Sequence, residues 1–178
     1  MKLSRLVAQG VLVRLKKGFY CLAPDYSDKL IELGVISNAL YGPSYVSFDS
    51  ALSLYGLIPE RTYETMAAVL KRGMTYRTPL GRFGYYQIPE SVFGIGVRSE
   101  KTANGTYLMA NPTKALCDTL FRKRLLRVTS PKTLREFLEV DMRLDFDYLG
   151  EPDRDVLQAY ANCGRKTGIF NALKRLFT

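Results

Sequence analysis

Histidine is absent from this sequence, and cysteine is scarce. Without an imidazole, the chain has no means to build a serine triad, a histidine-containing metal site or a histidine acid–base catalyst. Its three cysteines, Cys21, Cys117 and Cys163, lie far apart and form no CxxC pair, which predicts free thiols rather than a zinc site or a disulfide framework. We therefore expect no metal, no cofactor and no catalytic activity.

Long hydrophobic runs are also missing. No apolar stretch approaches the roughly 20 residues that a membrane-spanning helix needs, and the N-terminus lacks the layout of a signal peptide. We expect a cytoplasmic protein with no membrane partner. The segment Gly94-Ile95-Gly96 lacks the third glycine of a dinucleotide-binding loop. A hydrophobic content of 47% over 178 residues predicts a folded chain with a sizeable core.

Acidic residues are unevenly distributed in a chain whose net charge is +9. The first 22 residues carry five basic side chains and no acidic one, whereas residues 23–60 carry one basic and five acidic side chains. Basic charge gathered in blocks is what a polyanion-binding surface needs. An ordinary basic protein with solvated faces remains the alternative.

The basic N-terminus has the pattern of a helix followed by a hairpin. Residues 1–9 form an apolar stripe with a separate polar face and end at a glycine, and residues 11–15 and 19–22 read as two strands around a Lys-Lys-Gly turn. This order matches the back half of a winged helix, whose helix enters the major groove and whose wing reaches phosphate. The alternative is a basic edge hairpin that serves only the fold.

Six residues of this segment are the candidate DNA contacts. We expect groove-side contacts from the helix and phosphate contacts from the wing; they are Lys2, Arg5 and Gln9, and Arg14, Lys16 and Lys17. A helix-turn-helix needs preceding helices to brace its recognition helix, and the chain starts inside that last helix. We therefore expect a partial winged helix.

The rest of the chain predicts an α+β fold. Residues 28–41 and 47–56 have helical patterns; Ser47 suits an N-cap that accepts an amide hydrogen bond, and Gly56 suits a left-handed stop. Five short strands follow, at 63–70, 73–77, 84–88, 94–98 and 106–109, then helices at 112–121, 130–142, 152–162 and 167–177. We expect a partial N-terminal winged helix (1–42) packed on a mostly antiparallel sheet with C-terminal helices (43–178).

Further basic residues are interleaved with aromatic residues in the strands and crowd the end of the 112–121 helix. They are candidates for additional phosphate contacts: Arg72, Arg77, Arg82, Arg122, Lys123 and Arg124. Strand aromatics pack in cores more often than they stack on bases, and cations at a helix end also suit the helix dipole. Both alternatives stay open at this point.

The order of these motifs resembles the AbiEi family of antitoxins and transcriptional regulators. The similarity lies in the basic helix with its Val11-to-Tyr20 hairpin, in Tyr45-Val46-Ser47 leading to Ser50-Ala51-Leu52 and Tyr55-Gly56-Leu57, and in Asn111-Pro112-Thr113-Lys114-Ala115-Leu116-Cys117-Asp118. It covers essentially the whole chain. The individual motifs are short, and their order carries the resemblance.

This resemblance implies a function. Members of the family are encoded beside a nucleotidyltransferase-like toxin in abortive-infection systems. They bind double-stranded repeats in their own promoter through an N-terminal winged helix, and a C-terminal antitoxin domain assists. By position, the hairpin would be the wing and residues 1–9 the remnant of the recognition helix. The two later signature segments are assigned a scaffold role, because small and apolar residues there suit packing.

Two other classes of function remain. A metal-dependent nuclease would need acids such as Asp49, Glu100 and Asp118 to converge on Mg²⁺. Each of the two aspartates also has an ordinary explanation, in a first helical turn or on the surface. A protein-binding antitoxin module would recognise the toxin through its sheet and final helices, without specific DNA readout.

Overall fold

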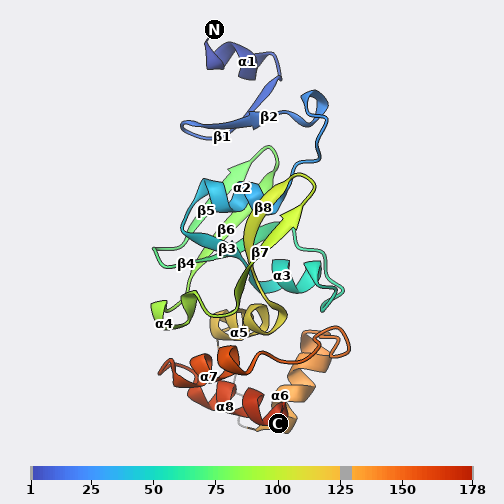
Figure 1. Ribbon diagram of the computed structural model, residues 1–178, viewed down its shortest axis with the longest axis vertical. Coiled ribbons are helices and arrows are strands. Elements are labelled where there is room, and N and C mark those ends of the chain that lie inside the picture. The colour runs from blue at the N-terminus through green and yellow to red at the C-terminus, as the bar shows by residue number, and fades with distance from the viewer. Residues whose placement is uncertain (1, 125–129, 178) are drawn as a thin grey trace.

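The computed structural model describes residues 2–124 and 130–177, so Met1 of the predicted first helix lies outside the described residues. The molecule is elongated (Figure 1). A short helix and a two-stranded hairpin lie at the N-terminal end, a six-stranded sheet occupies the middle, and a group of helices forms the other end. The predicted α+β class is confirmed.

The central sheet is mixed, with strand order β5-β6-β4-β3-β8-β7. Its strands are β3 (Ser44–Val46), β4 (Glu64–Val69), β5 (Met74–Thr78), β6 (Gly81–Gln87), β7 (Val97–Thr102) and β8 (Gly105–Ala110). Neighbours joined by tight turns, β5–β6 and β7–β8, are antiparallel, as is β3–β4, whereas β3–β8 and β4–β6 are parallel. The sequence did not predict β3, because three residues leading into a helix show no alternation.

Two helices cover this sheet. Helix α2 (Leu33–Leu40) packs against β3, β4 and β8, and α3 (Phe48–Leu54) packs against β4 and α5. The expected helix at 28–41 begins only at Leu33, and this start was predicted wrongly. Upstream, the Ser27 hydroxyl donates to the carbonyl of Lys29 and accepts its amide hydrogen, a local turn that competes with helix formation.

The end of α3 follows the sequence prediction, but its start does not. Gly56 has a φ of 71°, and the amide of Leu57 donates to the Leu52 carbonyl, which is the Schellman arrangement that glycine favours. Ser47 occupies the N-cap position, yet its side chain makes no capping hydrogen bond. The predicted capping hydrogen bond of Ser47 is therefore wrong, because the Ser47 hydroxyl donates to Asp118 instead.

Helix α5 (Pro112–Arg122) connects the sheet to the C-terminal helices. It packs against α3 on one side and α7 on the other, and every residue from Thr113 to Leu120 is buried. The remaining helical elements are η1 (Pro24–Tyr26), α4 (Glu90–Phe93), α6 (Pro131–Glu136), its π-helical continuation η2 (Phe137–Asp141), α7 (Arg154–Asn162) and α8 (Thr167–Leu176). No helix among residues 2–124 and 130–177 is long and apolar enough to cross a membrane.

The N-terminal elements have little core of their own. Helix α1 (Leu3–Ala8) has no buried residue, and Leu3 is 50% exposed. Strands β1 (Leu12–Lys16) and β2 (Phe19–Leu22) form a separate antiparallel sheet. This hairpin lies above the central sheet in Figure 1 and reaches it through contacts between β1 and β5.

Candidate nucleic-acid interface

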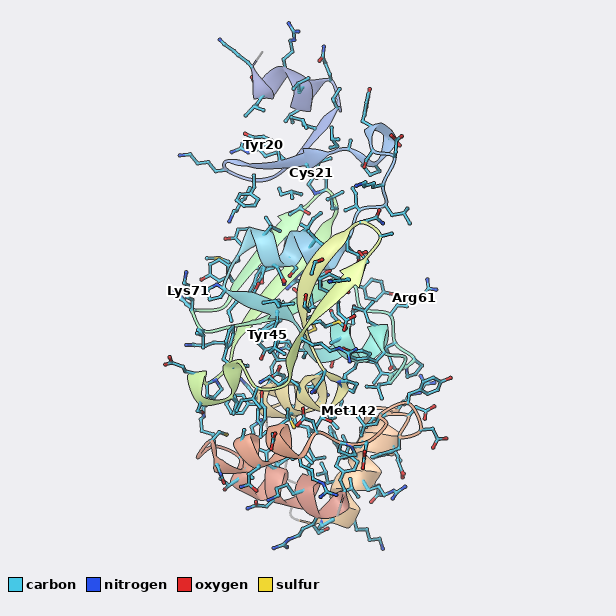
Figure 2. All side chains as sticks on the ribbon, in the orientation of Figure 1. Tyr20, Cys21, Tyr45, Arg61, Lys71 and Met142 are labelled. Atoms are coloured by element: carbon cyan, nitrogen blue, oxygen red, sulfur yellow. The ribbon has the colours of Figure 1, made fainter. Side chains whose placement is uncertain are left out.

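Helix α1 presents the predicted groove-side residues to solvent. Lys2 occupies the N-cap, Arg5 lies in the middle and Gln9 is the C-cap, and all three side chains are exposed. Their spacing places them on neighbouring turns. Figure 2 shows side chains of α1 standing away from the rest of the molecule at its N-terminal end.

The hairpin of β1 and β2 is called the wing below, after the role that the sequence predicts for it. Arg14 lies opposite Tyr20 and Lys16 opposite Phe19, with an irregularity between Arg14 and Lys16. Gly18 closes the turn with a φ of 78°, a conformation that glycine adopts without a steric penalty. Because side chains alternate across a strand, Arg14 points away from the sheet and is exposed, whereas Leu15 points toward it and is only 8% exposed.

Leu15 anchors the hairpin to the rest of the molecule. It belongs to an apolar cluster with residues of α2, β4 and β6, among them Leu40, Val69, Phe83 and Tyr85. Burying one leucine side chain is worth roughly 1.5–3 kcal/mol. The wing is therefore held through Leu15, with Val13 and Cys21 packed against the same cluster, while Arg14 and Lys17 remain exposed.

The two lysines at the tip of the wing have different surroundings. The ammonium of Lys16 donates to the carbonyl of Leu40 and lies 4.5 Å from the centroid of the Phe19 ring. Lys17, the next residue, is exposed. Of the six predicted contacts, Lys16 is thus directed into the protein, while the other five are at the surface.

Charge around α1 and the wing is of one sign. No acidic residue occurs between Lys2 and Leu22. Among the residues that the structure describes, Lys2, Arg5, Arg14 and Lys17 form no ion pair. Unpaired exposed cations keep their full charge available to a polyanion.

Of the three predicted strand arginines, Arg77 and Arg82 lie in the sheet, whereas Arg72 precedes it. Arg72 precedes β5 and is exposed, with its carbonyl accepting a hydrogen bond from Tyr41. Arg77 on β5 lies directly opposite Arg82 on β6. The Arg82 guanidinium is exposed but lies 2.8 Å from the carboxylate of Glu64, which partly neutralises its charge.

The last three candidates lie together at the end of α5. Arg122 and Arg124 are exposed and Lys123 is half-buried. In Figure 1 this helix lies on the far side of the sheet from α1. The candidates therefore form two separate basic regions, with the strand arginines between them. Arg165, from the segment between α7 and α8, joins the second region and was not among the predicted contacts.

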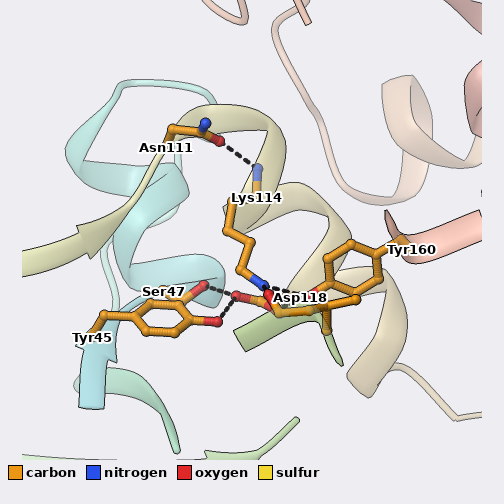
Figure 3. A network of polar contacts seen from close by, with 7 residues as sticks. Tyr45, Ser47, Asn111, Lys114, Asp118 and Tyr160 are labelled. Atoms are coloured by element: carbon orange, nitrogen blue, oxygen red, sulfur yellow. Dashed lines mark hydrogen bonds and ion pairs between the residues drawn. The ribbon is translucent and has the colours of Figure 1, made fainter. Parts of the chain in front are cut away.

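The interior of the protein holds a charged pair that sequence reasoning missed. Lys114 and Asp118, one turn apart on α5, are both 0% exposed, and the Lys114 ammonium lies 3.5 Å from a carboxylate oxygen of Asp118. The same ammonium donates to the Tyr160 hydroxyl at 3.0 Å (Figure 3). It also donates to the carbonyl of Val92 at 2.5 Å. The signal in the sequence was a lysine and an aspartate at i and i+4, with the apolar residues Ala115 and Leu116 between them.

The carboxylate of Asp118 accepts hydrogen bonds from hydroxyl groups of three separate elements. One carboxylate oxygen accepts hydrogen bonds from Ser47 at 2.6 Å and Tyr45 at 3.1 Å, and the other accepts one from Tyr160 (Figure 3). The carboxylate thereby joins the β3–α3 segment to α7 through α5. The desolvation of a buried ion pair offsets much of its attraction, but the loss of one partner leaves the other charge buried and uncompensated.

Burial controls the ionisation of this network. It lowers the pKa of Lys114, against the opposing effect of the Asp118 charge, and raises the pKa of Cys117 well above its usual value. The pKa values of Tyr45 and Tyr160 are raised well above 10, first by burial and then by the negative charge of Asp118. Both tyrosines consequently stay protonated as donors to the carboxylate.

The acids considered for a nuclease do not form a metal site. Asp118 is committed to the buried network, and Glu100 lies 2.5 Å from the Arg98 guanidinium. Asp49 accepts a long hydrogen bond from Thr119, at 3.5 Å. Within residues 2–124 and 130–177, no group of three histidine, cysteine, aspartate or glutamate side chains is placed to hold a metal ion.

Comparisons with known proteins add no assignment: no protein-family model matches the chain, and no curated protein matches it significantly. The exposed cations of this region lie on two elements, Lys2 and Arg5 on α1 and Arg14 and Lys17 on the wing. Exposed cations without acidic neighbours in sequence suit contact with a polyanion.

Proposed function

We propose that the protein is a cytoplasmic DNA-binding transcriptional regulator, and that it acts as the antitoxin of a toxin–antitoxin system. In this proposal α1 lies at the major groove of double-stranded promoter DNA, with Lys2, Arg5 and Gln9 toward the base edges. Arg14 and Lys17 on the wing contact backbone phosphates. Lys16 holds the wing against the sheet.

One observation carries the DNA-binding part of the proposal. Arg5, Arg14 and Lys17 are exposed and unpaired among the described residues, and they lie in a segment with no acidic side chain. The order of a helix followed by a hairpin supports the winged-helix interpretation. The antitoxin role rests on the family resemblance, which also supplies the candidate partner, a nucleotidyltransferase-like toxin encoded alongside.

Fluorescence-anisotropy titrations test DNA binding directly. The labelled probe is the duplex upstream of the gene, compared with a scrambled duplex of equal length at two salt concentrations. A regulator binds the upstream duplex more tightly, and its affinity falls as salt rises. Equal, weak and salt-sensitive binding to both duplexes would contradict sequence-specific regulation.

A protein-binding antitoxin without specific DNA readout is the second candidate. It is favoured by exposed apolar side chains between the wing and α2, where Leu30 is 83% exposed and Tyr26 is 56% exposed. Co-purification with the product of the neighbouring gene, abolished by Leu30→Asp, would support this candidate. Under the DNA-binding proposal, the same substitution leaves duplex affinity unchanged.

A further inference from the structure

A second basic region lies in a hollow between β6, the end of α5 and the turn that joins α7 to α8. The hollow has a volume of about 610 Å³. Among the described residues that line it, four are cations and none is acidic; these residues are Tyr86, Gln87, Phe121, Arg122, Lys123, Arg124 and Arg165. Among the residues that the structure describes, none of these four cations is paired with a carboxylate.

Aromatic rings hold three of these cations in place. The guanidinium carbon of Arg122 lies 3.9 Å from the centroid of the Tyr86 ring, and that of Arg165 lies 5.2 Å from the Phe121 ring. The Lys123 ammonium lies 5.5 Å from the Phe137 ring. A stacked guanidinium keeps its N–H edges free and loses little conformational freedom when it binds an anion.

The needs of the α5 helix end do not explain this charge. Lys166 already donates to the carbonyls of Leu120, at 2.9 Å, and Lys123, where α5 terminates. Burial lowers the pKa of Lys166, and the neighbouring Arg165 charge lowers it further. The hollow therefore contains more positive charge than the helix terminus uses.

We infer that this hollow binds a small polyphosphate, of the nucleoside diphosphate or triphosphate class, through Arg122 and Arg165. Its volume lies within the range of roughly 300–1,000 Å³ that is typical of small-ligand pockets. Cations from separate segments converge on one concave site, and a polyphosphate gathers several charges within a few ångströms. A double helix presents its phosphates on a convex surface, which suits the outward cations of α1 and the wing better than a hollow.

Isothermal titration calorimetry with the full chain tests the inference. The probes are inorganic tripolyphosphate, ATP and GTP, each titrated without DNA, so the result is independent of the proposed regulatory function. We expect saturable binding that weakens about tenfold or more in Arg122→Gln and in Arg165→Gln, because each variant loses charge-assisted hydrogen bonds. Arg154→Gln, an exposed arginine at the start of α7, is the control with the same charge change.

The outcomes separate the alternatives. Tighter binding of ATP or GTP than of tripolyphosphate would identify a nucleoside ligand, and equal binding would identify the phosphate chain alone; both support the inference. Equal loss of affinity in Arg154→Gln would overturn it, since the effect would then follow net charge. Absence of saturable heat with all three probes would also overturn it, whether or not the protein binds duplex DNA. Denaturant unfolding of each variant shows that the comparison is made on folded protein.

Discussion

The N-terminal segment and the centre of the molecule use positive charge in opposite ways. On α1 and the wing, Arg5, Arg14 and Lys17 are exposed and lack acidic partners among the described residues. In the centre, Lys114 is completely buried and bonded to a carboxylate, a carbonyl and a tyrosine hydroxyl. The buried lysine has its hydrogen-bond and ion-pair partners within the fold, whereas the exposed cations of the N-terminal segment remain available for contact with another molecule. Substitutions in the two regions should therefore affect different measurements.

The largest effect is expected at the centre, from Asp118→Ala. This variant leaves the Lys114 ammonium buried without its carboxylate and removes the acceptor of three hydroxyl groups. The free energy of unfolding should fall by about 3–5 kcal/mol, as when one partner of a buried pair is lost. Urea denaturation measures the change. Asp28→Ala, at an exposed aspartate, should stay within about 0.5 kcal/mol, and a similar loss at both sites would contradict the structural role of the network.

The next effect concerns the attachment of the wing. Leu15→Ala should destabilise the protein by about 2–3 kcal/mol, at the low end of the range for a buried leucine, because Leu15 joins the hairpin to the sheet cluster. The substitution should accelerate amide hydrogen exchange more in β1 and β2 than in the central sheet. Leu22→Ala is the matched control on the same hairpin, since Leu22 is 49% exposed. Uniform acceleration across the whole protein would show that the hairpin is not a separately attached unit.

Two adjacent lysines give a smaller but sharper contrast. Lys16→Ala should cost about 1 kcal/mol of stability, because it removes a hydrogen bond to Leu40 and a cation–π contact with Phe19. Lys17→Ala should leave stability unchanged and weaken binding to all duplexes alike. Thermal denaturation and anisotropy on both variants test the pair. A loss of stability in Lys17→Ala, with a loss of duplex affinity in Lys16→Ala, would contradict this assignment of the two lysines.

The last effect, which needs no substitution and appears only above pH 10, is a loss of stability at alkaline pH. Burial raises the pKa of Tyr85 and of Tyr55 to about 12, and raises those of Tyr45 and Tyr160 well above 10. The folded protein keeps protons that the unfolded chain releases near pH 10, so stability should fall as the pH rises above 10. The lowered pKa values of Lys114 and Lys166 act in the opposite sense, but they are two groups against these four tyrosines.

Tyrosinate absorbance during a pH titration shows at which pH the buried tyrosines lose their protons. A fraction of the 12 tyrosines should ionise only together with unfolding, and the same titration in urea should show a single early transition. Identical curves with and without urea would contradict the buried network.

The sequence predicted the local elements better than their long-range partners. The hairpin at β1–β2 and the stop at Gly56 depend on neighbouring residues, and both occur as expected. Ser47 was assigned a capping role because it precedes a helix, but its actual partner, Asp118, is 71 residues away. Lys16 was indistinguishable from Lys17 in a list of charges, since only the fold places Leu40 and Phe19 around its ammonium. The α5 hollow likewise depends on Arg165, which comes from a distant turn.

The most direct test of the central claim compares salt dependence in the two basic regions. Affinity for the upstream duplex is measured over a range of salt for the wild-type chain, for Arg14→Gln/Lys17→Gln and for Arg122→Gln/Arg165→Gln. If α1 and the wing are the DNA-binding surface, the first double variant lowers the slope of log affinity against log salt by about 0.9 for each lost contact, and the second leaves it unchanged. An unchanged slope in the wing variant, with a reduced slope in the α5 variant, would contradict the account.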